Sequence, residues 1–400
     1  MACAVCVCVY IALSVVFFVA RHFADSTDLA SLHKAVRLEP SNAEYRWRIG
    51  AFQFYNAKDT QAAALDFENA IHLNPFNARY WMDYAGALFN LGHLDESRTA
   101  LERAIRLNPT RPDLNWQAGN LYLALGDTNL ALHRFRTILD RDDKNPEYSV
   151  LPMCWRVTHD PELLIKEALP PRADVYLRFL DLVVSENNDE AAKTIWTTLS
   201  KFDPNLDPKQ VFPYFDFLVM HKDVAQSAAV WNYIASQSHM QDYRRPDDLV
   251  VNGSFEEPLL NGGFDWRYHE VRAVTLSIDD EKFHTGRQSL SISFSGENAD
   301  AGVVELVPVE KNSTYEFSTY AKAQNIQGAG GPQFQIQDLY DKHSLLLTDE
   351  MTETFNWRLV RGEFHTGAED SLVAIRIVRI PGNTLVRGKL WIDDVSVRRK

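Results

Sequence analysis

Cysteine is scarce in this sequence of 400 residues. Three of the four cysteines, Cys3, Cys6 and Cys8, lie in the first ten residues, and Cys154 is the only other one. Disulfide bonds between distant parts of the folded chain are therefore excluded. The three N-terminal cysteines lie in an apolar run without a fourth ligand, so we interpret them as small residues of a membrane helix rather than as a metal site.

The sequence also lacks an excess of basic residues and the motifs of common catalytic sites. Its formal net charge is −13, whereas a nucleic-acid-binding protein needs a basic face. It contains no phosphate-binding loop, no His-Glu-x-x-His and no nucleophile elbow. These absences predict a protein that does not bind nucleic acid and is not an enzyme.

The N-terminal segment is apolar. Residues 2–20 carry no charge, and a helix of that length spans roughly 28 Å, close to the hydrocarbon thickness of a bilayer. We predict a transmembrane anchor over 1–22. A cleaved signal peptide is the main alternative, although no basic segment precedes the apolar run. The repeat register described next gives a third interpretation, in which this stretch is the first helix of an earlier repeat.

The following segment repeats with a period of about 34 residues. Pro40, Pro75 and Pro109 are separated by 35 and then 34 residues, and each ends a similar motif, as in Ala70-Ile-His-Leu-Asn-Pro75 and Ala104-Ile-Arg-Leu-Asn-Pro109. Small and large apolar residues recur in the same register between the prolines. The period predicts stacked helical hairpins, in which small residues allow two helices to approach and proline ends the second helix.

This pattern resembles the tetratricopeptide repeat. The resemblance implies an α-solenoid over 25–150, and weaker helical periodicity extends it as a degenerate region over 151–245. Its first helices would line a groove that binds a protein partner as an extended peptide or a helix. The residues that we assign to this groove are Arg48, Phe52, Tyr55, Asn56, Met82, Phe89, Asn90, Trp116 and Asn120. The alternative is that several of these aromatic residues are buried between hairpins.

After Pro246 short alternating runs bounded by Gly, Asn and Pro replace the helical period, which predicts an all-β domain over 247–400. Its opening Leu249-Val-Val-Asn-Gly-Ser-Phe-Glu256, the segment Gly263-Phe-Asp-Trp266 and the closing Leu390-Trp-Ile-Asp-Asp-Val-Ser-Val397 resemble the galactose-binding-like carbohydrate-binding modules of the family 4/9 and family 22 type. The resemblance implies a two-sheet jelly-roll sandwich.

The same resemblance implies a structural calcium ion. Glu256 and one of Asp393 or Asp394 would be its ligands, together with backbone carbonyls of residues 282–284. The alternative is that these carboxylates are solvated or accept hydrogen bonds from backbone amides.

Sugar binding needs flat aromatic faces and paired polar side chains. Strand alternation places Gln335 and Gln337 on one face of their strand. Our candidate carbohydrate contacts are Trp266, Tyr268, Gln335, Gln337, Tyr340 and Trp357, with the alternative that the tryptophans are core residues.

Together these features predict a multidomain α and β protein: a membrane-anchored, non-enzymatic scaffold that binds protein partners and a polysaccharide. We place it in the inner membrane with its bulk in the periplasm, acting in bacterial exopolysaccharide or envelope polysaccharide assembly or export, although the single flanking Arg21 favours the opposite orientation. The alternative function is a protein–protein scaffold whose sandwich does not bind sugar.

Overall fold

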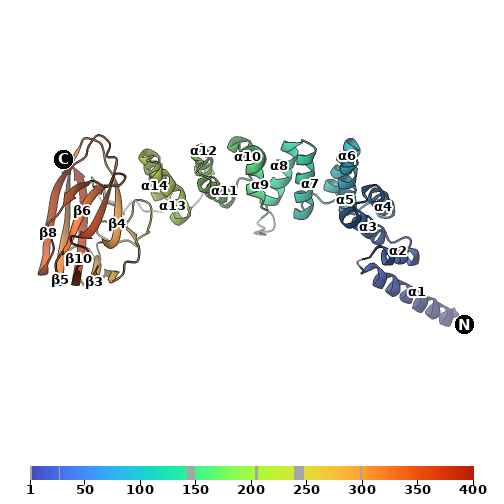
Figure 1. Ribbon diagram of the computed structural model, residues 1–400, viewed down its shortest axis with the longest axis horizontal. Helices are drawn as coiled ribbons and strands as arrows, with labels where there is room; N and C mark the ends of the chain where they lie inside the picture. The colour runs from blue at the N-terminus through green and yellow to red at the C-terminus, as the bar shows by residue number, and fades with distance from the viewer. Residues whose placement is uncertain (1, 27, 142–148, 203–205, 238–246, 298–299) are drawn as a thin grey trace. The chain divides into compact units, whose positions relative to one another are not determined.

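A computed structural model describes residues 2–26, 28–141, 149–202, 206–237, 247–297 and 300–400. Helices occupy the first part of the chain and strands the last (Figure 1). The helices are α1 (Ala2–Ala24), α2 (Leu29–Leu38), α3 (Ala43–Phe52), α4 (Thr60–Leu73), α5 (Ala78–Asn90), α6 (Leu94–Leu107), α7 (Pro112–Ala124), α8 (Thr128–Leu139), α9 (Val150–Thr158), α10 (Pro161–Glu167), α11 (Ala173–Ser185), α12 (Asp189–Leu199), α13 (Pro208–Met220) and α14 (Val224–Gln237). A π-helical turn, Gln53–Ala57, follows α3, and a 3₁₀ turn, Ser200–Phe202, follows α12.

The repeating segment forms the helical hairpins α3–α4, α5–α6 and α7–α8. Close packing within a hairpin depends on small residues, because a Cβ atom on Gly119 would lie 2.4 Å from the ring of Phe135. Gly92 and Gly126 follow the first helices of the second and third hairpins with φ of 81° and 83°, a backbone conformation that glycine adopts without strain. The hairpins expected from the sequence period are thus confirmed.

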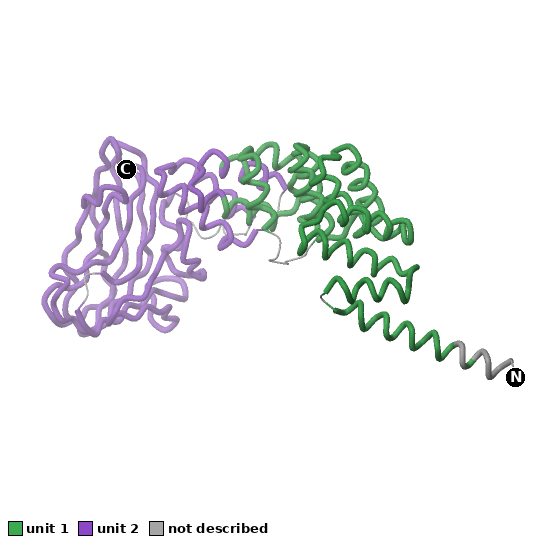
Figure 2. The backbone as a smooth tube through the Cα atoms, turned by 45° about the vertical axis from the view of Figure 1, so that its right-hand side comes forward, with its two compact units in different colours: residues 1–182, 193–195 green, residues 183–192, 196–400 purple. Residues whose placement is uncertain are grey.

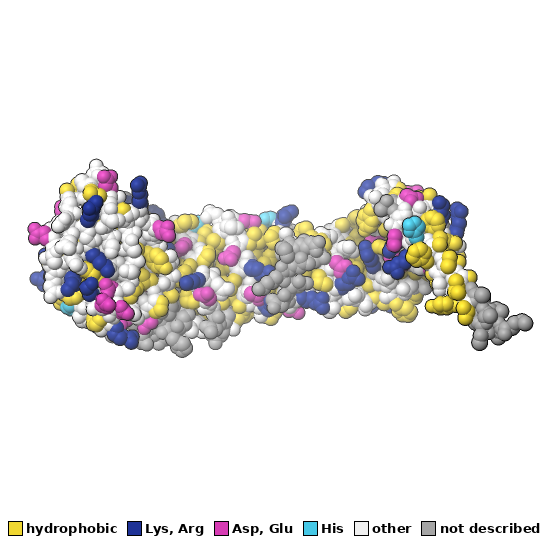
Figure 3. All heavy atoms as spheres, turned by 90° about the horizontal axis from the view of Figure 1, so that it is seen from below, with side chains coloured by type: hydrophobic (Ala, Val, Ile, Leu, Met, Phe, Trp, Pro, Cys, Tyr) yellow, Lys and Arg dark blue, Asp and Glu magenta, His cyan; other side chains and the backbone are white. Residues whose placement is uncertain are grey.

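The N-terminal helix α1 packs its last turns on α2, where Ala20 and Ala24 are buried with Leu32 and Ala35. Most large side chains in the described part of α1 before these turns are exposed, and Figure 3 shows hydrophobic side chains gathered beside the grey N-terminal residues. Within the described residues, we find no helix with the length and apolarity needed to cross a membrane. The side chains of residues 1–6, 8 and 9 lie outside that description, and the predicted anchor over 1–22 receives no support.

The chain divides into two compact units (Figure 2). One unit comprises residues 1–182 and 193–195, and the other comprises 183–192 and 196–400. The second unit therefore contains the helical hairpin α13–α14 as well as all the strands.

The strands form a sandwich of two five-stranded antiparallel sheets. The first sheet has the order β1-β4-β9-β6-β7 and the second the order β2-β3-β10-β5-β8. The bounds are β1 (Arg267–Tyr268), β2 (Val274–Asp279), β3 (Ser289–Glu297), β4 (Asp300–Pro308), β5 (Thr314–Gln327), β6 (Pro332–Asp338), β7 (Ser344–Leu347), β8 (Glu353–His365), β9 (Leu372–Arg379) and β10 (Leu385–Arg399).

Alternating side chains of both sheets build one core. Along β5, Tyr315, Phe317 and Ala321 are buried while Glu316 is exposed, as expected for a strand with one face on the core and one in solvent. The core also contains Phe334 and Ile336 of β6, from the opposite sheet. The alternating runs of the sequence are therefore confirmed as strands of a β-sandwich.

Candidate functional site

The loop that precedes β1 packs against the hairpin α13–α14. Phe264 places its ring edge-on to Phe215 of α13, with 4.8 Å between ring centroids, and also contacts Trp231 of α14. The two glycines before it permit this approach, because a Cβ atom on Gly262 would lie 2.2 Å from Phe212 and one on Gly263 would lie 2.2 Å from Trp231. The Gly-Gly-Phe segment is thus the docking point of the helices.

A pocket of about 540 Å³ lies beside this contact, between α13 and the first sheet. Its volume is within the range of small-molecule sites. Apolar side chains from both sides line it, among them Val219, Met220, Val304, Leu306, Leu339 and Ala374. Its polar lining consists of Asp216, Arg267, His269, Asp300, Gln337, Tyr340, Lys342 and Arg376. The pocket thus combines apolar walls with several hydrogen-bonding groups.

Ion pairs fix the arginines of the pocket. Arg267 of β1 donates to Asp216 of α13 over 2.7 Å and to the carbonyl oxygen of Gly263. Arg376 of β9 pairs with Asp300 of β4. Because each guanidinium is held by a carboxylate, its remaining N–H groups point in fixed directions.

Tyr340 contributes a polar group without a protein partner. Its hydroxyl is buried and makes no hydrogen bond among the described residues. Burial, followed by the charges of Asp338 and Asp223, raises the pKa of Tyr340 to about 12, so the hydroxyl stays protonated at neutral pH. The ammonium group of Lys222 lies 5.1 Å from the centroid of the Tyr340 ring. The hydroxyl is therefore a neutral hydrogen-bond donor on a residue that lines the pocket.

The predicted carbohydrate contacts fall in four places. Gln337 and Tyr340 line the pocket, whereas Gln335 and Tyr268 lie on the same sheet outside its lining, with Tyr268 44% exposed. Trp357 lies on β8 of the other sheet, near His284. The prediction that Trp266 contacts a sugar is corrected. This residue is 1% exposed, packs against Phe255 in the core and offers no free ring face.

The polar residues that the sequence reasoning missed come from neighbouring strands and from α13. Arg267 follows the buried Trp266, so strand alternation could have indicated that its side chain points away from the core. Asp300 and Arg376 could not have been paired without the strand register. Nothing in the sequence indicated that Asp216 of the helical region would join them.

A smaller pocket of about 240 Å³ lies in the helical unit. Of the nine predicted groove residues it brings together Tyr55, Met82, Phe89, Asn90 and Asn120. Of the others, Arg48 pairs with Glu44 and Asp25, Phe52 packs at the α1–α2 core, Trp116 contacts Phe135, and Asn56 is exposed in the π-helical turn.

Asp83, which was not predicted from the sequence, also lines this smaller pocket. It accepts hydrogen bonds from the indole of Trp47 over 2.7 Å and from the hydroxyl of Tyr55 over 3.0 Å. Burial raises the pKa of this carboxyl group. Asp83 thus holds two aromatic side chains of the preceding hairpin in place.

The predicted calcium ligands lie at one end of the second sheet and face hydrogen donors. Oδ2 of Asp393 accepts from the backbone amides of His284 and Thr285, and Oε1 of Glu256 accepts from those of Arg287 and Gln288. Asp394 accepts from the ring of His284 and the hydroxyl of Thr285. Burial, and then the charge of Asp394, raise the pKa of Asp393 to about 6. Asp393 and Glu256 thus accept hydrogen bonds from backbone amides, which is the alternative that the sequence left open, and the calcium ion stays a prediction.

Two segments match known family models. Residues 247–380 match a carbohydrate binding domain, and residues 53–112 match a tetratricopeptide repeat. No curated protein sequence matches the chain.

Several solved structures are similar to part of this chain. A structure titled "CBM4 structure and function" is 16% identical over 38% of this chain and 99% of its own, with a TM-score of 0.30. The CBM22-1 xylan-binding domain of Xyn10C from Paenibacillus barcinonensis is 18% identical over 37% of this chain and 91% of its own, with a TM-score of 0.28. MamA from Desulfovibrio magneticus RS-1 is 19% identical over 29% and 67%, with a TM-score of 0.26. The chain thus combines a tetratricopeptide repeat segment with a β-sandwich that matches the carbohydrate binding domain family.

Proposed function

We propose that this protein is a non-catalytic adaptor that binds a saccharide in the pocket between α13 and the first sheet and a protein partner along its helical repeats. The observation that carries the saccharide part is the pocket itself, where apolar walls meet fixed arginines, Gln337 and the unpartnered hydroxyl of Tyr340. Apolar walls suit the C–H faces of a sugar, and the polar groups suit its hydroxyls.

The family match over 247–380 supports this assignment. In the helical unit, Asn90, Asn120 and Gln117 line the smaller pocket, and amide side chains of this kind suit the backbone of an extended peptide. A role in exopolysaccharide assembly or export, a membrane anchor and a periplasmic location are parts of the sequence-based hypothesis that stay untested predictions.

The test of saccharide binding uses Tyr340→Phe in the full chain. Because the hydroxyl makes no hydrogen bond within the described protein, its removal leaves the melting temperature unchanged or slightly raised. If the hydroxyl binds the ligand, the affinity for a bound saccharide falls by about 2- to 12-fold, the loss of one hydrogen bond. Titration against soluble bacterial exopolysaccharides and plant β-glucans, followed by tryptophan fluorescence, measures this change.

Tyr268→Phe is the matched control, because Tyr268 is exposed and does not line the pocket. The control should bind as the unaltered chain does. Equal affinities for Tyr340→Phe, Tyr268→Phe and the unaltered chain would place the saccharide elsewhere. If no saccharide binds while Asn90→Ala weakens the complex with an identified protein partner, the alternative of a pure protein–protein scaffold is favoured.

A further inference from the structure

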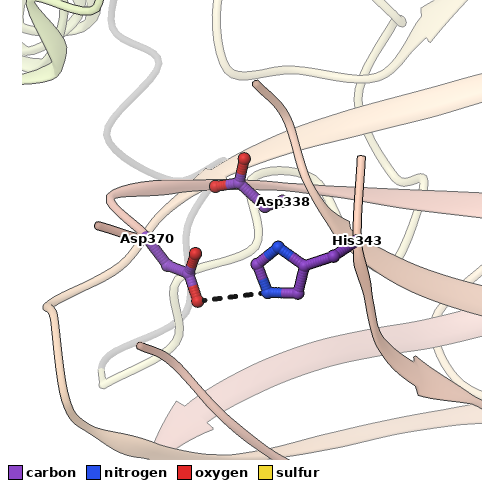
Figure 4. A group of neighbouring side chains, drawn as sticks. All are labelled: Asp338, His343 and Asp370. Atoms are coloured by element: carbon purple, nitrogen blue, oxygen red, sulfur yellow. Dashed lines mark ion pairs between the residues drawn. The ribbon is translucent and has the colours of Figure 1, made fainter. Parts of the chain in front are cut away.

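Three side chains of metal-ligating type meet at one end of the first sheet, beside the turn that contains Tyr340. Asp338 ends β6, His343 immediately precedes β7, and Asp370 lies just before β9. One potential ligand atom from each lies within 4.8 Å of the others, and this is the one such group found in the described part of the chain. Figure 4 shows the carboxylate of Asp370 facing the imidazole of His343, with Asp338 beside this pair.

The imidazole is oriented by a fourth side chain. Nδ1 of His343 lies 2.5 Å from Oδ1 of Asp341, and Nε2 faces Oδ2 of Asp370 at 3.5 Å. A carboxylate on one ring nitrogen fixes the tautomer and directs the lone pair of the other nitrogen toward a metal ion. The ring thus has the arrangement of a histidine ligand supported by an outer carboxylate.

Both aspartates are nearly fully buried, each 3% exposed. Oδ1 of Asp338 accepts from the amides of Tyr340 and Asp341, and Oδ2 of Asp370 accepts from the amide of Gly367. These backbone amides hold both carboxylates in fixed positions at the edge of the cluster. Two buried carboxylates this close repel each other unless a cation lies between them.

We propose that Asp338, His343 and Asp370 bind a divalent transition-metal ion, with Zn²⁺ as the best fit. One imidazole nitrogen and two carboxylate oxygens form a three-ligand set that zinc accepts with water in the fourth position, whereas calcium takes six to eight oxygens. Zinc bonds of about 2.0–2.2 Å require the ligand atoms to move closer together than they are now. His343, with 44% of its side chain exposed, provides the route of entry.

The site would fasten the turn between β6 and β7 to the loop that precedes β9. Asp338 also accepts a hydrogen bond from the backbone N–H of Tyr340, which lines the pocket. The ion would therefore stiffen one wall of the pocket without touching a ligand bound there. The proposal does not depend on saccharide binding, because metal binding is measured without any sugar.

The experiment titrates the full chain with Zn²⁺ by calorimetry and with Co²⁺ by visible absorption. We expect His343→Ala and Asp370→Asn each to lose one bound equivalent relative to the unaltered chain. Asp341→Asn removes only the outer carboxylate and should weaken binding by about 10- to 100-fold. His93→Ala is the matched control, because it removes an exposed histidine paired with Glu96 in the other unit, and it should bind as the unaltered chain does.

Counting the equivalents lost separates this site from the N-terminal cysteines, which are present in every variant and would show thiolate absorption bands if they bound cobalt. If His343→Ala binds as many equivalents as the unaltered chain with the same affinity, the proposal is overturned. The same conclusion follows if Zn²⁺ raises the melting temperature of His343→Ala as much as that of the unaltered chain. In either case His343 is only the cation of an ion pair with Asp341 and Asp370.

Discussion

The outer faces of the two sheets in the sandwich differ in what lies against them. The first sheet meets α13, and the contact encloses the pocket that contains Arg267 and Tyr340. The second sheet exposes Leu359 and carries surface ion pairs such as Lys400 with Glu363. Each sheet contains strands that alternate in sequence, such as β6 in the first sheet and β3 in the second. Alternation therefore tells which side chains share a face, and it does not tell what covers that face.

The largest expected change in the free energy of unfolding comes from disrupting the packing of α13–α14 against the first sheet. Gly263→Val places a branched side chain at φ 63°, where its Cβ atom would lie 2.2 Å from Trp231. Strain and overpacking together should lower the free energy of unfolding by about 3 kcal/mol. Urea unfolding followed by tryptophan fluorescence measures the loss.

Gly92→Ala is the control for backbone strain alone. Gly92 has a similar positive φ of 81°, but a Cβ atom added to it would meet no other atom within 4 Å, so the cost should be about 1 kcal/mol. Equal losses for the two variants would mean that the contact with Trp231 does not hold the hairpin on the sandwich.

The second effect distinguishes the two faces by ligand binding. Arg267→Ala removes the guanidinium that Asp216 and the carbonyl oxygen of Gly263 position, and the affinity for a saccharide should fall at least tenfold, or about 1.4 kcal/mol. Trp357→Ala alters the other sheet and should leave the affinity unchanged. Calorimetric titration of both variants with the saccharide measures these affinities. If Trp357→Ala weakened binding and Arg267→Ala did not, the saccharide would be assigned to the second sheet.

The third effect is a pH dependence of the free energy of unfolding, which we expect from Asp265 in the loop before β1. Burial raises the pKa of Asp265 to about 7 from an ordinary value of 3.8. The folded chain thus keeps this proton up to about pH 7 while the unfolded chain loses it near pH 3.8, so the free energy of unfolding should fall as pH rises between these values. Asp265→Asn should lessen this fall.

Asp393, whose pKa is raised to about 6, contributes in the same direction, so the informative quantity is the difference between the unaltered chain and Asp265→Asn. Urea unfolding at pH 5, 6, 7 and 8 gives this difference. If it does not change with pH, Asp265 is ionised in the folded protein.

The smallest effect belongs to the second sheet. Lys322 is a partly exposed residue of β5 whose ammonium donates to Asn356 over 2.9 Å in an exposed hydrogen bond. Lys322→Ala should change the free energy of unfolding by less than about 0.5 kcal/mol, because an exposed hydrogen bond exchanges readily with water. A loss comparable to that of Gly263→Val would indicate that the second face is also covered.

The sequence predicted the elements well where a physical period repeats. The spacing of Pro40, Pro75 and Pro109 identified the helical hairpins, and the alternation along 315–321 and 333–337 identified strands of a sandwich. These signals are local, since each depends on side chains a few residues apart. The degenerate helices gave a weaker signal, and the docking of α13–α14 on the sandwich gave none, because it depends on contacts between Phe215 and Phe264.

The candidate sites were predicted only in part, because the sequence shows local patterns but not contacts between distant elements. Gln337 and Tyr340 were found because polar residues recur along β6 and its turn, and five of the nine groove residues share one pocket. Trp266 was misplaced because an aromatic residue next to a turn suits both a core and a sugar platform, and only burial distinguishes them. Asp83 and the group around His343 were missed because their partners lie on other elements.

The contact of Phe264 with Phe215 and Trp231 has a consequence for where the chain can be cut. A fragment that starts at residue 247 would leave the ring of Phe264 and the adjoining apolar surface in water, and we expect it to be less soluble than one that starts before Pro208. A fragment for producing the sandwich should therefore begin before Pro208, within the helical region, and not at the change from helical to strand periodicity.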